Sequence, residues 1–243
     1  MAAKKARCGA RAKTFSPDAP QTPRLLKTVA QAAQSRHAGQ GEAARLASTY
    51  LTISGLREEP MPTSFADPFE ILDFWWQAGP EKWFARDDAF DTEIAERFSD
   101  IQQVAAEGGF DGWAETPHGT LALLLLLDQF PRNLFRNDPR AFASDPKALH
   151  IARMSLAHGF HRAFPKNARI FFFLPFEHAE DSDAQQTSVD LFRQLGDEQG
   201  YLYALVHMDV IRRFGRFPHR NPVLGRTTTP EEQAYLDSGG FSA

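Results

Sequence analysis

Four short signals in the sequence each mark the start of a helix. In every one, an aspartate or a threonine stands directly before a proline, as in Asp67-Pro68, Thr116-Pro117, Asp145-Pro146 and Thr229-Pro230. Asp and Thr side chains accept hydrogen bonds from the unpaired amides of a first helical turn. Proline suits the first helical position because no amide hydrogen is needed there. A chain with these signals before successive apolar segments is constrained to fold into a series of separate helices.

The spacing of apolar residues agrees with these signals. Phe90, Ile94 and Phe98 recur at the interval that lines one face of a helix. No segment alternates with the period of a strand, and no hairpin dipeptide separates two apolar runs. The sequence therefore predicts an all-α fold of antiparallel helix pairs, either in a bundle or in a superhelical array. The expected helices cover residues 68–79, 90–107, 116–130, 145–159, 167–181, 183–195 and 199–214, with a short last helix from 229.

Residues 1–60 differ in amino-acid composition from the rest of the chain. They are rich in Ala, Gln, Ser, Thr, Gly and basic residues and contain no tryptophan. Three interpretations stay open: a disordered basic tail, an organellar transit segment, or a wrongly assigned start with Met61 as the true first residue. No continuous apolar stretch follows the basic start, so a secretory signal is not expected. Residues 61–243 are expected to form a single all-helical domain.

Charge is distributed unevenly along the chain. Residues 1–60 contain ten Lys or Arg and four acidic residues. The remaining residues contain 17 Lys or Arg and 27 acidic residues. The acidic body is a poor match for nucleic acid, because affinity for the phosphate backbone comes from Lys and Arg. An anion site in this chain must therefore be a local basic pocket.

Cysteine content and hydropathy narrow the class of protein further. The single cysteine, Cys8, allows no internal disulfide and excludes a cysteine-based zinc site. A reducing, cytoplasmic compartment fits this cysteine usage. The longest apolar run, residues 121–127, is too short to cross a bilayer, which takes about 20 residues. We therefore expect a soluble protein with no membrane partner.

The first of three clusters that could carry chemistry lies at the end of the leucine-rich helix, in residues 128–133. Asp128 and Arg132 would be delivered to the rim of the core there, and both are candidate ligand-binding residues. The alternative is structural. The two side chains would then form an ion pair, or bind free backbone groups, where Pro131 breaks the helix.

The second cluster follows the apolar run at residues 170–174. If the helix continues past Pro175, then His178, Asp181 and Gln185 share one helix face. An imidazole above a carboxylate suits a general base with its orienting partner. His178, Glu180 and Asp181 are therefore candidate catalytic residues, and Gln185 is a candidate ligand-binding residue. The alternative is a capped helix end with a solvated acidic tip.

The third cluster runs from residue 207 to residue 226. His207 shares a helical stripe with Tyr203, Val210 and Phe214, so it is expected to face inward, where a lone histidine is more often a core residue than a ligand. The arginine-rich segment that follows is typical of carboxylate or phosphate capture. Alternatively, these arginines pair with the surplus acids of the body. The candidates are His207 and His219 for catalysis, and Arg216, Arg220, Asn221 and Arg226 for ligand binding.

The motifs of these clusters resemble those of the bacterial domain of unknown function 924 family. The matching strings are DQFPRNLFR at 128–136, FFLPFEHAED at 172–181 and HMDVIRRFGRFPHRNPVLGRTTTPEE at 207–232. FxxLxFWW at 69–76 and KWF at 82–84 resemble the opening of the family. The family usually has His-Ser-Glu-Asp where this chain has alanine at position 179, so no nucleophile is assigned there.

The resemblance implies an all-helical fold similar to the tetratricopeptide-like superfamily, and no established activity. It also implies that the three clusters are family motifs. Family proteins commonly start near the position of Met61, which favours a wrongly assigned start for residues 1–60. The motif positions that carry over are Asp128, Arg132, His178, Glu180, Asp181, His207, Arg216, His219, Arg220 and Arg226.

Two functions from different classes follow. In the first, the clusters converge on a pocket that binds a small molecule with a phosphate or carboxylate group, and His178, oriented by Asp181 or Glu180, acts as acid or base. Proton transfer or metal-assisted hydrolysis fits better than covalent catalysis, because no Ser or Cys has the setting of a nucleophile. No cofactor is required, but a divalent ion held by His178, Asp181 and His207 stays open.

In the second function, a tetratricopeptide-like array binds an acidic peptide or a C-terminal carboxylate in a groove lined by arginines. The two functions differ in geometry. A pocket that gathers His178, His207 and Arg220 favours the small-molecule site, whereas an open arginine groove away from His178 favours the peptide module.

Overall fold

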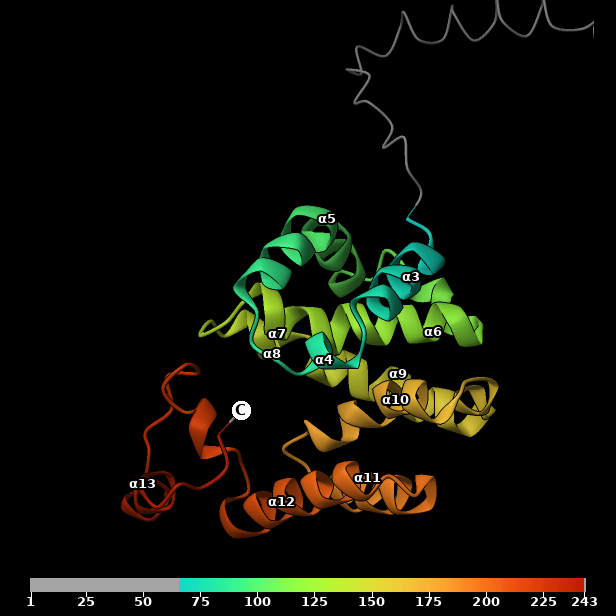
Figure 1. Cartoon of the computed structure of the whole chain (residues 1–243). Helices are drawn as coiled ribbons and strands as arrows, with labels where there is room; N and C mark the ends of the chain where they lie inside the picture. The colour runs from blue at the N-terminus through green and yellow to red at the C-terminus, as the bar shows by residue number, and fades with distance from the viewer. Residues whose placement is uncertain (1–65, 243) are drawn as a thin grey trace, which may run out of the picture. The chain divides into compact units, whose positions relative to one another are not determined.

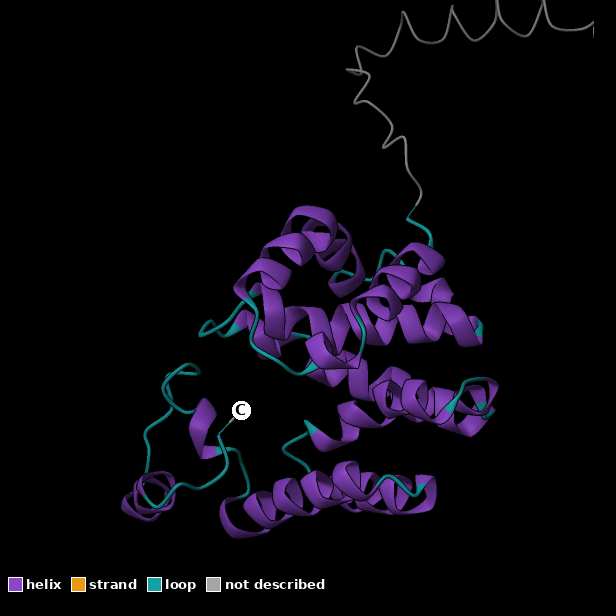
Figure 2. Ribbon diagram, in the orientation of Figure 1, coloured by secondary structure: helices purple, strands orange, loops and turns teal. Residues whose placement is uncertain are grey.

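The computed structural model describes residues 66–242, and every regular element among them is helical (Figures 1 and 2), which confirms the all-α prediction. The interpretations of residues 1–60 lie outside the described residues. The α-helices are α3 (Pro68–Ala78), α4 (Pro80–Trp83), α5 (Asp88–Ala106), α6 (Pro117–Leu124), α7 (Phe130–Leu134), α8 (Arg140–Ala143), α9 (Asp145–His158), α10 (Lys166–Glu177), α11 (Ser182–Leu195), α12 (Glu198–Phe214) and α13 (Pro230–Asp237). A π-helical segment, η2, spans Leu125–Gln129, and the 3₁₀ turns are η1 (Asp111–Glu115), η3 (Phe160–Ala163) and η4 (Pro218–Arg220).

Three of the four residues predicted to cap a helix accept the expected hydrogen bond from its first turn. Asp67 accepts a hydrogen bond from the amide of Phe69 at 2.9 Å, and Thr116 accepts one from Gly119 at 3.2 Å. Thr229 forms a full capping box with Glu232. Asp145 begins α9, but its side chain makes no cap hydrogen bond and is used elsewhere, as described below.

The leucine-rich segment is the centre of the core. Every residue from Leu121 to Leu127 is fully buried. Helix α6 packs against α3, α9 and α10, so apolar side chains are needed all around it rather than on one face. A group of aromatic rings from α3, α7 and α10 meets beside it, with Trp75 5.5 Å from Phe130 and 5.7 Å from Phe171.

The predicted helix over residues 116–130 contains a π-helical turn that the sequence pattern does not reveal. It spans Leu125–Gln129 and ends two residues before Pro131. Proline has no amide hydrogen, so the carbonyl of Leu127, four residues earlier, has no α-helical donor. The hydroxyl of Ser144 donates to this carbonyl at 2.6 Å. Turns of this kind occur frequently at functional sites.

Helices α10, α11 and α12 pack on one another in sequence order (Figure 1). The turn between α11 and α12 uses Gly196, whose φ of 70° is easily adopted only by glycine. A second, smaller apolar cluster of Val210, Ile211 and Phe217 joins the end of α12 to α13. These contacts agree with pairing of consecutive helices, and a tetratricopeptide-like superhelix stays a prediction.

None of the helices within residues 66–242 combines the length and the apolar character that crossing a membrane requires.

Truncation of the core should be costly here. Leu124→Ala removes a side chain with 0% exposure and should lower the free energy of unfolding by about 2–5 kcal/mol. Leu202→Ala is the matched control, because Leu202 is 59% exposed and should change stability by about 0.5 kcal/mol or less. Urea denaturation of both variants measures the difference. Similar losses would show that Leu124 isn't packed as described.

Candidate functional site

A histidine and an aspartate from two different clusters form the centre of the candidate site. The Nδ1 of His178, at the end of α10, lies 2.8 Å from Oδ1 of Asp128 in the π-helical segment. The side chain of Asp128 is 1% exposed and that of His178 is 18% exposed. Within residues 66–242 no hydrogen bond reaches Nε2 of His178, so this nitrogen is free to act on another molecule.

The state of Asp128 decides the tautomer of His178. Burial alone would raise the pKa of Asp128, but attraction to His178, the hydrogen bond with it and the charge of Arg132 outweigh burial and hold this pKa below its usual value. A carboxylate can only accept, so Nδ1 of His178 donates and Nε2 of the neutral ring carries the lone pair. An imidazole oriented in this way is typical of a general base.

Asp145 holds two arginines from different clusters. Nη2 of Arg132 lies 2.8 Å from Oδ1 and 2.9 Å from Oδ2 of Asp145, and Nη1 of Arg220 lies 3.4 Å from Oδ2. Arg132 also lies 3.9 Å from Asp128, so the ion pair predicted between these two residues is present but secondary. Burial, with the charge of Arg132, lowers the pKa of Arg220 to about 10, so Arg220 is charged at neutral pH.

Aromatic rings enclose these guanidinium groups. Arg220 lies between the rings of Phe142 and Phe217, 4.5 Å from each centroid. The guanidinium of Arg132 also lies over the ring of Phe142, 4.7 Å from its centroid. Contacts of this kind are favourable because the face of the ring is negative, and they are stronger where water is excluded. The rings therefore hold both arginines in one orientation beside Asp145.

A second ion pair connects the loop after α10 to the arginine-rich segment. Arg226 binds Glu180 through two hydrogen bonds of 2.7 and 2.9 Å. Glu180 also accepts from the amide of Phe217 at 2.8 Å. Burial would raise the pKa of Glu180, but these bonds lower it, so Glu180 stays ionised. Glu180 thus anchors the third cluster to the second.

His207 forms a buried pair with an acid that was not among the predicted site residues. Its Nδ1 donates to the carbonyl of Tyr203 at 2.8 Å and lies 3.3 Å from Oε1 of Glu177. Burial lowers the pKa of His207 to about 3 and raises that of Glu177 to about 8, so both are neutral near pH 7. The ring of His207 lies 6.3 Å from that of His178, and it is buried as predicted. Tyr203 is 48% exposed and doesn't share the buried stripe.

His219 lies beside the same group of aromatic residues. Its ring is 5.7 Å from Phe217 and 5.3 Å from Phe241, and Phe241 also lies 4.2 Å from His207. Burial, with the charge of Arg220, lowers the pKa of His219 to about 4, so its ring is neutral at pH 7. Nδ1 of His219 and Nε of Arg220 are buried and have no hydrogen-bond partner within residues 66–242.

Four predicted site residues stabilise the fold and form no hydrogen bond with His178 within residues 66–242. Gln185 donates to the carbonyls of Glu177 and Ala179 and so caps α10. Asp181 caps α11 through the amide of Ala184 and pairs with Arg153. Arg216 and Asn221 both bind Glu232 and thereby fix the start of α13.

Two predictions about the second cluster are wrong. Helix α10 passes through Pro175 but ends at His178, and α11 starts after Asp181, so His178, Asp181 and Gln185 do not share one helix face. The partner of His178 is Asp128 rather than Asp181 or Glu180. Across residues 66–242, no three or more His, Cys, Asp or Glu side chains are arranged to hold a metal ion.

The sequence interpretation missed three residues that shape the site. Asp145 was predicted only as a helix start, and Glu177 was part of a motif without a role. Phe142 carries no local signal, because its position between two arginines depends on packing. The surplus of acids does indicate that some arginines are paired, and Arg216, Arg220 and Arg226 are each paired with an acid.

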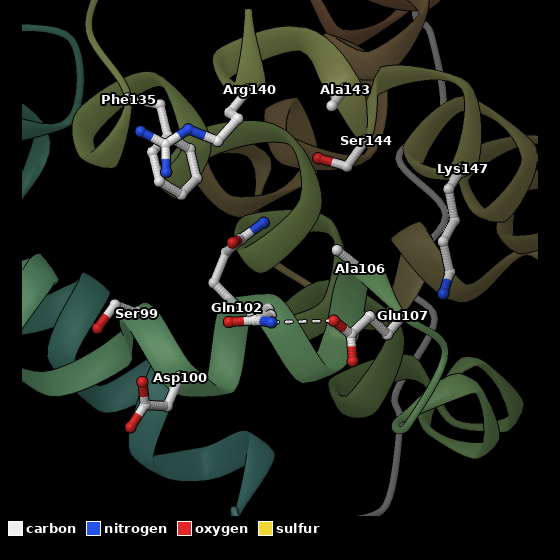
Figure 3. A pocket seen from close by; sticks show the side chains of 11 residues that line it. Ser99, Asp100, Gln102, Ala106, Glu107, Phe135, Arg140, Ala143, Ser144 and Lys147 are labelled. Carbon is white, nitrogen blue, oxygen red and sulfur yellow. Dashed lines mark hydrogen bonds between the residues drawn. The ribbon is translucent and has the colours of Figure 1, made fainter. Parts of the chain in front are cut away.

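Two cavities lie elsewhere. One of about 680 Å³ lies between α5 and the α8–α9 junction (Figure 3), and one of about 510 Å³ lies beside Arg213 and Glu231. Neither is lined by His178, His207 or Arg220. His178 and His207 do lie close together, with ring centroids 6.3 Å apart, but neither of these two cavities is the pocket that the small-molecule hypothesis requires.

Comparison with known proteins agrees with the motif resemblance. The family model for bacterial proteins of unknown function, DUF924, matches residues 71–240. The solved structure of a protein of unknown function, ATU0120 from Agrobacterium tumefaciens, is similar with a TM-score of 0.69 and 48% sequence identity, covering 71% of this chain and 97% of that chain. No match was found among curated proteins. The resemblance predicted from the motifs is thereby confirmed.

The buried carboxyl of Glu177 should make stability depend on pH. Its pKa in the folded protein, about 8, exceeds the ordinary value of 4.5, so its stabilising contribution is present below about pH 4.5 and is lost as the pH rises toward 8. Glu177→Gln should therefore gain stability relative to the wild type by roughly 1.4 kcal/mol per pH unit across this window. Urea denaturation at pH 5, 6.5 and 8 measures this gain, with Glu198→Gln as a surface control. A constant difference would contradict the assignment.

Removing the shared counter-charge of two arginines should be costly. Asp145→Ala leaves Arg132 and the buried Arg220 without their carboxylate and should lower the free energy of unfolding by about 3–5 kcal/mol. Asp190→Ala breaks an exposed pair with Arg193 and should cost about 1 kcal/mol or less. Chemical denaturation compares the two variants. Equal losses would mean that Asp145 does not balance the arginines.

Proposed function

This chain belongs to the DUF924 family, and within that family we propose that it is a small-molecule enzyme whose general base is His178. The proposal rests on one observation: Nδ1 of His178 lies 2.8 Å from the buried carboxylate of Asp128. The two residues are contributed by separate motifs and meet only through the fold. A histidine that faces outward with one nitrogen while a buried carboxylate holds the other is arranged for proton transfer.

The proposed chemistry begins with removal of a proton from the substrate, or from a water molecule, by Nε2 of His178. The ring becomes an imidazolium, and the carboxylate of Asp128 stabilises this charge while it keeps the ring in place. Because Asp128 stays ionised, it accepts the Nδ1 hydrogen throughout and needs no proton of its own. Return of the proton to the product restores the starting state.

An unpaired donor near the dyad supports an anionic group on the substrate. The buried Nε of Arg220 has no partner within the described residues. Buried donors without acceptors are rare in proteins, and a phosphate or carboxylate oxygen would satisfy this one. Nη1 of Arg220 lies 3.4 Å from Asp145, so the site would bind one anionic group rather than a highly charged ligand.

The test is turnover of a defined panel of phosphorylated and carboxylated metabolites, followed by nuclear magnetic resonance and mass spectrometry. The wild type should convert at least one member. His178→Gln should reduce its kcat by about 100-fold or more, and Asp128→Asn should reduce kcat with a smaller change in KM. His158→Gln, which changes an exposed histidine of α9, is the matched control.

The outcomes separate catalysis from binding. Conversion that His178→Gln leaves unchanged would overturn the role of His178. If a metabolite of the panel raises the Tm of the protein but no metabolite is converted, the enzyme assignment is overturned and a binding site remains. Binding of an acidic peptide, with no effect of the metabolites, would support the tetratricopeptide-like interaction module instead.

A further inference from the structure

The segment that follows α13 places an aromatic ring against the candidate site. Residues 238–242, the strap, turn back from α13 toward η4 (Figure 1). The ring centroid of Phe241 in the strap lies 4.2 Å from that of His207 and 5.3 Å from that of His219. The centroid of Phe217 is 6.3 Å away. The strap therefore covers this part of the site with a half-buried ring of its own.

The three side chains that receive this ring are themselves aromatic and uncharged. The centroid of Phe217 lies 5.5 Å from that of His207 and 5.7 Å from that of His219, and Phe217 is fully buried. Burial lowers the pKa of His207 to about 3 and that of His219 to about 4, so neither ring carries a charge at pH 7. Aromatic rings at such distances attract one another in tilted and edge-on arrangements. The position of Phe241 thus suits a neutral planar ring, whichever molecule supplies it.

This position adjoins both parts of the proposed active site. The ring of His207, which Phe241 contacts, has its centroid 6.3 Å from that of His178. The guanidinium of Arg220 lies 4.5 Å from the centroid of Phe217, and its buried Nε has no hydrogen-bond partner within the described residues. A small molecule with a ring in place of Phe241 would therefore lie close to the proposed base and to the unpaired donor.

Tyr235 holds Gly240 and Phe241 of the strap through two hydrogen bonds. The amide of Phe241 donates to the hydroxyl of Tyr235 at 2.8 Å, and the amide of Gly240 donates to the carbonyl of Tyr235 at 3.0 Å. No residue of the strap has a charged side chain. Water can replace both hydrogen bonds when the strap moves away, so their loss is only a modest cost. A ligand ring in the place of Phe241 would restore the aromatic contacts that the strap gives up.

Gly240 decides how closely the strap can approach α13. A Cβ atom at this position would lie 2.5 Å from both the carbonyl oxygen and Cζ of Tyr235, closer than van der Waals contact allows. The carbonyl belongs to the backbone of α13 and cannot turn aside, so a side chain at position 240 would move the strap. Gly240→Ala therefore displaces Phe241 without changing it.

We propose that Phe241 occupies a subsite for the ligand, and that a planar ring of the ligand displaces the strap and binds against His207, Phe217 and His219. The anionic group of the same ligand would bind Arg220, so this assignment rests on the proposed function. The ligand is then an aromatic or heteroaromatic molecule with a phosphate or carboxylate group. An anion without a ring gains nothing from displacing the strap.

The test uses the full chain and calorimetric titration with phenylphosphonate, which carries a ring, and methylphosphonate, which does not. Phe241→Ala removes the competing ring and should strengthen phenylphosphonate binding by about tenfold, because the open subsite is then populated without a ligand. Gly240→Ala should change it in the same direction. Binding of methylphosphonate should stay the same in both variants. Gly112→Ala, at an exposed glycine with no atom near its Cβ position, is the matched control and should bind like the wild type.

A second measurement separates displacement of the strap from a merely structural role of Phe241. In the wild type, phenylphosphonate should speed hydrogen exchange of the Phe241 amide, because the strap then leaves the hydroxyl of Tyr235. Methylphosphonate should leave this exchange unchanged. This measurement changes no residue, so it also serves if either variant does not fold.

Tighter phenylphosphonate binding by both variants, with faster exchange in the wild type, supports the subsite. Three results would overturn it: equal phenylphosphonate binding by the wild type and both variants, an equal gain for methylphosphonate, or exchange that phenylphosphonate leaves unchanged. His178→Gln combined with Phe241→Ala should keep the gain, since binding of the ring needs no base.

Benzyl alcohol, a ring without an anion, decides the subsite apart from the proposed function. If neither phosphonate binds any of these proteins, the proposed anion site at Arg220 fails. Tighter binding of benzyl alcohol by Phe241→Ala and Gly240→Ala than by the wild type would then still support the subsite, and equal binding would overturn it.

Discussion

The carboxylate of Asp128 is completely buried at the end of the leucine-rich core, and the C-terminal half is organised around compensating this charge. An isolated buried carboxylate would be protonated or would destabilise the fold. Here His178 supplies a hydrogen bond and Arg132 a nearby positive charge. Each partner must then be held in place, and this requirement extends the polar cluster from α7 to the segment after α12.

A sequence of ion pairs meets this requirement. Asp145 balances Arg132 and Arg220, and Glu180 balances Arg226. The rings of Phe142 and Phe217 enclose the guanidinium of Arg220, which limits its rotamers and excludes water. The result is a group of charged side chains that their partners hold in one orientation. Such preorganisation would suit the proposed proton transfer, because little rearrangement would accompany the movement of charge.

The π-helical turn joins this cluster to the cavity beside it. Within the turn, Leu127 presents the carbonyl that Pro131 cannot bond, and the next residue, Asp128, holds His178. Ser144 lines the cavity and binds the Leu127 carbonyl, whereas its neighbour Asp145 binds the arginines. The segment at the start of α9 therefore contributes both to the lining of the cavity and to the arginine cluster.

The sequence alone determined the helical fold, the places where α3, α6, α9 and α13 begin, the buried leucine segment and the three motifs from which the site is built. These features depend on neighbours within a few residues, so spacing and capping residues reveal them. Only the tertiary structure decided that His178 pairs with Asp128, fifty residues away, and that α10 ends at His178. It also decided that Asp145 serves as a counter-charge and that Gln185 serves as a cap. Those roles depend on which helices pack together. The residues next to a charged side chain in the sequence do not indicate which distant residue will lie beside it in the fold.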